Sequence, residues 1–280
     1  MSLEGKRPFK FWIIIGMSFL LMLAYLLATA PEPLVGSEEV KFAMSTEEAL
    51  TLLAHENDVT RTLYTRAIVG KGKEQGLQFS EDWQHQEVIA GPLPALFLRG
   101  VADYLTSSDV PLGLYLGSDF PIESSNRFQG KQAEEFKKMR ADGKPKIFRD
   151  EVLGETIGMY PDLATAKACV SCHNDHENTT KSDWVLGDLM GATTWSYPGD
   201  SVTTDEFLSM LLAYRSGVAE VWERYLEEVE QLEEEARPAV GEKWPSSGFN
   251  LPNASVFQDS VASQSSPYLV NELTKLIDSN

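Results

Sequence analysis

The sequence contains very little cysteine and comparatively little positive charge. Its 280 residues include only two Cys, so the dense disulfide framework of a small secreted domain is excluded. The 24 Lys and Arg are outnumbered by 42 Asp and Glu, which gives a net charge of −18. A chain this acidic repels phosphate backbones, and nucleic acid is therefore not an expected partner.

The rest of the composition is that of a folded protein. Hydrophobic residues make up 42%, charged residues 24% and aromatic residues 10% of the chain, so extensive disorder is not expected. A length of 280 residues is enough for one substantial domain with additional segments, or for two small domains.

One uncharged run, residues 11–30 (FWIIIGMSFLLMLAYLLATA), is long enough to match a hydrocarbon thickness of about 30 Å. Cations precede the run and anions follow it, which places the N-terminus in the cytoplasm: Lys6, Arg7 and Lys10, then Glu32, Glu38 and Glu39. A cleaved signal peptide is the alternative, because residues 28–30 (ATA) resemble a cleavage site. The length of the run and Pro31 after that site favour an uncleaved anchor.

Periodic patterns downstream predict a mixed fold. Ser45 and Glu48 have the spacing of a capping box, and apolar residues follow at helical intervals, which predicts a helix from about 46 to 69. Further helices are expected over 92–104, 129–139 and 268–278, strands over 112–116, 146–152 and 187–197, and irregular chain over 238–266. This mixture indicates an α+β fold with a small, largely antiparallel sheet.

A longer helix of about thirty residues is expected after residue 200. Its apolar stripe steps by three and four residues: Phe207, Leu211, Tyr214, Val218, Val221, Tyr225, Val229 and Leu232. The stripe is rich in aromatic residues and spans only about three heptads, so packing within the domain is favoured over a coiled-coil dimer.

Both cysteines belong to one short motif, Cys169-Val170-Ser171-Cys172-His173. Two thiols three residues apart can reach the two vinyl groups of one porphyrin edge and form thioethers, and the adjacent imidazole then reaches the iron. The motif therefore predicts one covalent haem c, attached to Cys169 and Cys172, with His173 as the proximal iron ligand.

Three other interpretations of the motif are open. A thioredoxin-like redox pair would be expected near a βαβ pattern, which the sequence does not show. A disulfide closing so small a ring would constrain little of the unfolded chain. Zinc would require the strained set Cys169, Cys172, His173 and His176. The position of the motif after a predicted export segment favours haem.

The residues around the motif resemble a known family. Residues 169–192 (CVSCHNDHENTTKSDWVLGDLMGA) are similar to the signature of the periplasmic PAS-like c-type haem domains, long catalogued as a domain of unknown function. The specific parts are the Cys-x-x-Cys-His-Asn core, Lys-x-Asp-Trp at 181–184 and Gly-Asp-x-x-Gly at 187–191. A weaker similarity covers about residues 45–198. Members occur as lone exported cytochromes and as input modules of histidine kinases or nucleotide cyclases.

The resemblance implies a PAS-like antiparallel sheet with flanking helices around one haem. Together with the patterns above, the expected fold is α+β, with one N-terminal transmembrane helix and a helical C-terminal extension. The expected divisions are 1–36 for the cytoplasmic N-terminus and anchor, 37–200 for the haem domain, and 201–280 for a helical and extended C-terminal segment that the resemblance does not cover.

The sixth iron position is left open by the sequence. Some relatives use a cysteine there, but this chain has no third Cys. The candidate distal ligands are His55 and His85, with Met44 and Met159 as further candidates, and an iron with an open site is also consistent. Trp184 and Trp195 are candidate walls of the haem pocket, with ordinary core packing as the alternative.

These observations favour a periplasmic, membrane-anchored monohaem cytochrome that transfers single electrons. Expected partners are the membrane, a basic redox protein and a larger membrane complex. A haem-based redox or gas sensor acting through a partner, and a structural accessory subunit, are the alternatives. No nucleophile–base arrangement stands out, so an enzyme is not expected.

Overall fold

The computed structural model describes residues 17–22, 25, 29, 43–242, 244–245 and 250–279. The chain divides into two compact units, Met1–Lys41 and Phe42–Asn280. In the first unit, residues 17–22 are helical, and the Thr29 hydroxyl donates a 2.7 Å hydrogen bond to the Tyr25 carbonyl. All of the elements described below belong to the second unit.

The structure does not support the predicted transmembrane helix. Within the ranges it describes, no helix combines the length and the apolar composition that crossing a bilayer requires. The two longest helices, α7 (Thr204–Glu230) and α8 (Ala254–Ser279), carry charged residues along their length. Of the predicted span 11–30, only residues 17–22, 25 and 29 are described, and the remainder lies outside the described residues. This part of the fold prediction is corrected accordingly.

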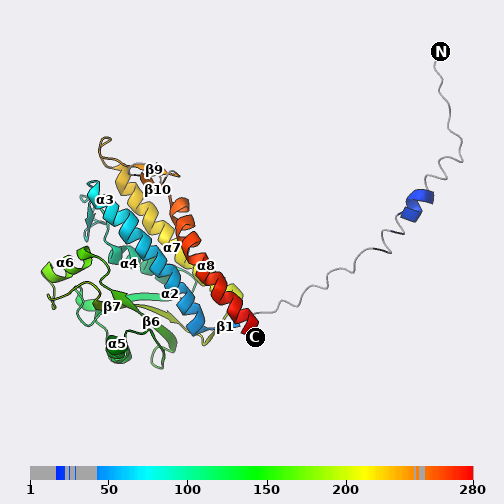
Figure 1. Ribbon diagram of the computed structural model, residues 1–280, viewed down its shortest axis with the longest axis horizontal. Helices are drawn as coiled ribbons and strands as arrows, with labels where there is room; N and C mark the ends of the chain where they lie inside the picture. Colours follow the sequence, from blue (N-terminus) through cyan, green and yellow to red (C-terminus); the bar gives the residue numbers. More distant parts are fainter. Residues whose placement is uncertain are drawn as a thin grey trace, which may run out of the picture. The chain divides into compact units, whose positions relative to one another are not determined.

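A helical layer forms one side of the second unit (Figure 1). Its main members are α2 (Thr46–Leu63), α4 (Pro94–Ser107), α7 and α8, and α2 continues into a π-helix, η1 (Tyr64–Gly70), and the short α3 (Lys71–Glu74). Helix α7 contacts both α4 and α8, and α8 also contacts α2. The four long helices therefore share one apolar core.

A four-stranded antiparallel sheet lies against this layer. Its order is β4-β7-β6-β5, formed by Gly113–Gly117, Leu189–Tyr197, Glu155–Leu163 and Lys146–Asp150. Leu114, Tyr160 and Trp195 belong to the face packed on the helices. Met159 and Ala192 belong to the opposite face, whose apolar cluster also includes residues of α5 (Gly130–Asp142). Because side chains alternate along each strand, the two faces of the sheet contribute to two separate apolar clusters.

The expected PAS-like sheet is wrong, although the α+β class is right. In the described residues the six strands outside the main sheet form three separate two-stranded pairs. These pairs are β1 (Ala43–Ser45) with β8 (Ser201–Thr203), β2 (Phe79–Ser80) with β3 (Gly91–Pro92), and β9 (Ala239–Gly241) with β10 (Asn250–Pro252). Strands of two or three residues offer too few ladder hydrogen bonds to extend the main sheet.

Helices α2 and α7 begin with capping boxes. At α2 the Ser45 hydroxyl accepts from the Glu48 backbone N–H, and the Glu48 carboxylate accepts from the Ser45 N–H, as the sequence predicts. Thr203 and Glu206 make the equivalent bonds at α7. Each box satisfies backbone donors that the first helical turn leaves free.

The C-terminal segment differs from the prediction. Helix α8 begins at Ala254, fourteen residues before the expected start, and contains Pro267. Serine hydroxyls along it donate to carbonyls of the preceding turn, including Ser266 to Ala262 at 2.5 Å. Phe257, Val261 and other apolar side chains of α8 enter the shared core, and this tertiary packing stabilises a helix in a Ser-rich sequence.

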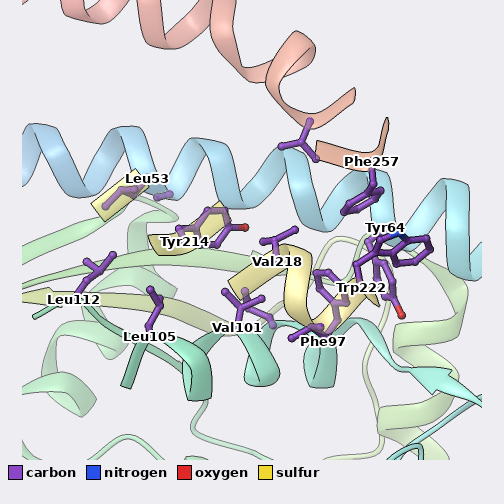
Figure 2. Close-up of a cluster of buried hydrophobic side chains, with 14 of the residues drawn as sticks. Leu53, Tyr64, Phe97, Val101, Leu105, Leu112, Tyr214, Val218, Trp222 and Phe257 are labelled. Atoms are coloured by element: carbon purple, nitrogen blue, oxygen red, sulfur yellow. The ribbon is translucent and has the colours of Figure 1, made fainter. Parts of the chain in front are cut away.

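The aromatic centre of this core surrounds Trp222 of α7 (Figure 2). The Trp222 side chain is fully buried, and its ring stacks on Phe257 of α8 with 5.1 Å between centroids. Its edge meets Tyr64 at 6.2 Å, and its Nε1–H donates to the Pro252 carbonyl at 3.1 Å. One side chain thus joins η1, α7, α8 and β10.

We predict that Trp222→Ala lowers the free energy of unfolding by about 3–5 kcal/mol, because a large cavity opens where four elements meet. The measurement is urea unfolding followed by circular dichroism. The matched control is Leu212→Ala on the same helix, where the side chain is 62% exposed and a change within about 0.5 kcal/mol is expected. Similar losses in the two variants would contradict a core centred on Trp222.

Candidate functional site

The cysteine motif lies on a short helix, α6 (Lys167–Asp175), between β6 and β7. No residue of α6 is fully buried. The chain before α6 is tied to the turn before β7, since the Ala164 N–H donates to the Asp188 carbonyl at 2.9 Å and the Gly187 N–H donates to the Ala164 carbonyl at 3.0 Å. These two backbone hydrogen bonds, together with the burial of Ala164, fix where α6 starts.

Cys169 and Cys172 are both free thiols and both half-buried. Cys169 packs beside the small buried cluster of Ala164, Trp184 and Met190. Burial raises the pKa of the Cys172 thiol, and the nearby Glu81 carboxylate raises it further. Cys172 is therefore a neutral thiol at pH 7, whereas the reactive cysteine of a redox pair has a lowered pKa.

His173 follows the second cysteine and is half-buried. Burial lowers the pKa of its imidazole, and the opposing charge of Asp162 compensates for only part of that effect. The ring is therefore neutral at pH 7, and neutral imidazole is the form that ligates a metal. The Thr179 hydroxyl is 2.6 Å from the His173 carbonyl oxygen, which ties the end of α6 to the loop that follows.

Asn174, the asparagine that follows the Cys-x-x-Cys-His motif, makes two hydrogen bonds to the backbone of Trp184. Its Oδ1 accepts from the Trp184 backbone N–H at 2.8 Å, and its Nδ2 donates to the Trp184 carbonyl at 3.0 Å. We call this pair of bonds the Asn174–Trp184 clasp. It closes the loop between the two residues and holds the Trp184 ring beside Cys169.

The other motif residues shape the same loop. Lys181 Nζ lies 4.3 Å from the centroid of the Trp184 ring, a cation–π contact, and it also pairs with Asp183. Gly187 has a φ of +90°, a conformation that favours glycine. A Cβ at Gly191 would lie 2.4 Å from the Gly117 carbonyl oxygen, so only glycine lets β7 approach β4 at this point.

His176 has both ring nitrogens engaged. Its Nδ1 accepts from the Asn178 N–H at 3.1 Å, and its Nε2 lies 3.2 Å from Glu81 Oε2. A zinc ion held with His176 as fourth ligand would have to break one of these bonds. In the part of the chain that the structure describes, no group of three or more His, Cys, Asp or Glu side chains is placed to hold a metal ion.

The predicted pocket tryptophans lie in different clusters. Trp184 is 5% exposed and meets Phe120 edge-on with 6.2 Å between centroids, next to Cys169. Trp195 is fully buried in the main core, where its ring meets Tyr214 of α7 at 5.6 Å. The structure thus brings Trp184 to the motif and places Trp195 between the sheet and α7.

The candidate distal ligands lie apart from one another. His55 belongs to α2, and its ring centroid lies 4.0 Å from that of Tyr268 of α8. His85 is 73% exposed, on the turn that begins near Glu81. The two candidate methionines are buried in separate clusters: Met44 in the main core, and Met159 on the sheet face that packs on α5.

A half-buried ion pair near the motif carries no sequence signal, because its partners are 101 residues apart. Arg61 of α2 binds both carboxylate oxygens of Asp162 through Nη2, at 2.9 and 3.0 Å. Its Nη1 donates to the Thr193 hydroxyl at 3.2 Å. Asp162 is the charge that acts most strongly on His173, so this pair belongs to the surroundings of the motif.

Two buried donors beside the motif have no acceptor among the described residues: Arg61 Nε and Trp184 Nε1. A buried donor without a partner costs about 1–3 kcal/mol. A haem carries two carboxylate side chains, which are suitable acceptors for such donors. Two free thiols, a neutral imidazole and two unpaired donors therefore form a set that fits a covalent haem.

No protein-family description, curated protein or solved structure matches this chain.

We predict that Asn174→Ala opens the loop after α6. Each lost hydrogen bond contributes about 1 kcal/mol, so hydrogen exchange of the Trp184 amide should accelerate by roughly 30-fold. The measurement is hydrogen–deuterium exchange with fragment mass analysis. The control is Asn178→Ala, an exposed asparagine in the same loop whose backbone, rather than side chain, bonds His176. Unchanged exchange at Trp184 would show that the clasp does not hold the loop.

Proposed function

We propose that this protein is a monohaem c-type cytochrome that transfers single electrons. Cys169 and Cys172 bind the porphyrin through thioethers, and His173 is the proximal iron ligand. The observation that carries the proposal is the chemistry of α6, which presents two free thiols and a neutral imidazole on one helix of nine residues. The engaged ring nitrogens of His176 disfavour a zinc site, and the raised pKa of the Cys172 thiol disfavours a reactive redox pair.

The chain's own residues have defined tasks in this proposal. Each thiol adds across a vinyl group, so that a C–S bond forms, the thiol hydrogen moves to the neighbouring carbon and no net oxidation occurs. The bound haem supplies an iron that accepts and returns one electron. The Asn174–Trp184 clasp orients α6, and burial keeps His173 free of a proton.

We place the haem-bearing unit on the periplasmic side, where haem is attached to Cys-x-x-Cys-His motifs. Its expected electron partner is a basic protein. Exposed carboxylates follow the outer face of α7 and the turn after it: Glu220, Glu223, Glu227, Glu230, Glu233, Glu234 and Glu235. Such a surface accelerates association with a cationic partner, and added salt weakens the effect.

Single-cysteine variants test the attachment. We predict that Cys169→Ala and Cys172→Ala each retain haem through one thioether, with a shifted band in the alkaline pyridine spectrum of the reduced haem. The double variant should lose all haem to acidic solvent extraction. Ser171→Ala, an exposed residue between the two cysteines, is the control and should match the unmodified protein. Extractable haem in the unmodified protein would contradict covalent attachment.

Carbon monoxide separates electron transfer from gas sensing. An electron carrier with both axial positions filled should keep its reduced Soret band in carbon monoxide and titrate reversibly as a one-electron couple. His55→Ala and His85→Ala are compared with the unmodified chain, because loss of a distal ligand would make the band respond to the gas. A strong shift in the unmodified protein would contradict this proposal and favour the sensor hypothesis.

A further inference from the structure

Arg61 has a buried Nε–H donor with no acceptor among the described residues. Attachment of a haem to the cysteines of α6 does not by itself explain this donor. The guanidinium uses Nη1 and Nη2 on Thr193 and Asp162, and its Nε–H is buried with no partner among the described residues. The head group cannot turn away from this arrangement without losing three hydrogen bonds. The Nε–H is therefore held in one direction, toward whatever acceptor occupies that side.

Chain connectivity places this donor near the cysteine motif. Asp162 is the penultimate residue of β6, and α6 begins five residues later, at Lys167. The intervening chain is pinned at Ala164 by its two backbone bonds to Gly187 and Asp188. Five residues of chain cannot carry α6 far from Asp162, so a ligand as large as a porphyrin attached to α6 can extend to the Arg61 side chain.

The positive charge of the guanidinium favours a carboxylate as the acceptor of the Nε–H. A guanidinium N–H matches a carboxylate better than a neutral acceptor, and such charge-assisted bonds are among the stronger hydrogen bonds in proteins. Because Asp162 already neutralises much of the Arg61 charge, the additional acceptor gains mainly a directed hydrogen bond rather than a full ion pair.

We propose that Arg61 binds a propionate carboxylate of the haem through its unpaired Nε–H. This inference rests on the haem site proposed above and adds a second anchor to it, remote in sequence from the cysteine motif. Arg61 thereby acts as a specificity residue for the acidic edge of the porphyrin, while Asp162 and Thr193 position its guanidinium.

A thermodynamic cycle tests this contact directly. The full chain carrying Cys169→Ala and Cys172→Ala is titrated with ferric protoporphyrin and with its dimethyl ester, in which both propionates are blocked. The ratio of the two dissociation constants is then measured again after Arg61→Gln. We expect Arg61→Gln to reduce the preference for the free acid by about tenfold, the effect of one charge-assisted hydrogen bond.

Two further variants protect the result against misfolding and long-range charge effects. Arg61→Gln combined with Asp162→Asn removes the carboxylate that would otherwise be left without its cation, and it should show the same loss of preference. Arg66→Gln changes an exposed arginine in η1, five residues further along, and should leave the preference unchanged.

The outcomes separate this inference from the proposed function. A preference for the free acid that is the same with and without Arg61 overturns the inference. Failure of the cysteine-free chain to bind either porphyrin also overturns it. Covalent haem on the unmodified chain is measured separately, and only its absence removes the proposed function as well.

Discussion

The position of α6 depends on hydrogen bonds at both of its ends. No residue of this helix is fully buried, and Cys169 and Val170 pack on the small cluster of Ala164, Trp184 and Met190 rather than on the main core. Its start is set by Ala164, whose backbone is paired to the turn before β7, and its end is held by Asn174. These bonds therefore set where the two thiols and the imidazole lie.

This arrangement divides the second unit of the chain into a scaffold and a site with different sources of stability. The scaffold is an aromatic core centred on Trp222, where transfer of apolar area from water dominates. The site is polar and half-buried, and its largest interactions are the clasp, the His176–Glu81 contact and the Arg61–Asp162 pair.

Local patterns in the sequence predicted much of the fold and the centre of the site. The capping box at Ser45, the apolar stripe of α7 and three of the four strands of the main sheet are short-range signals, and the structure confirms them. The Cys-x-x-Cys-His motif is equally local. Strand β6 was not predicted, because Gly158, Pro161 and Asp162 interrupt its apolar pattern and are tolerated only in this tertiary context.

The remaining features depend on contacts between distant parts of the chain. Residues 254–266, the first half of α8, have the composition of a Ser-rich loop, and their helical structure is explained only by the core that accepts Phe257. The Arg61–Asp162 pair joins residues from α2 and β6, and nothing at either position marks it in the sequence. The PAS-like sheet, which came from a resemblance around α6, was wrong because a local motif does not determine how the remaining strands pair.

The most direct test of the central claim is the intact mass of the full chain, produced by export into an oxidising compartment together with a haem-attachment system. The account predicts a denatured mass that exceeds the polypeptide mass by one haem, and the loss of that increment when Cys169 and Cys172 are both replaced by alanine. A polypeptide mass without the increment, or one lower by two hydrogens because the two thiols have formed a disulfide, would contradict it.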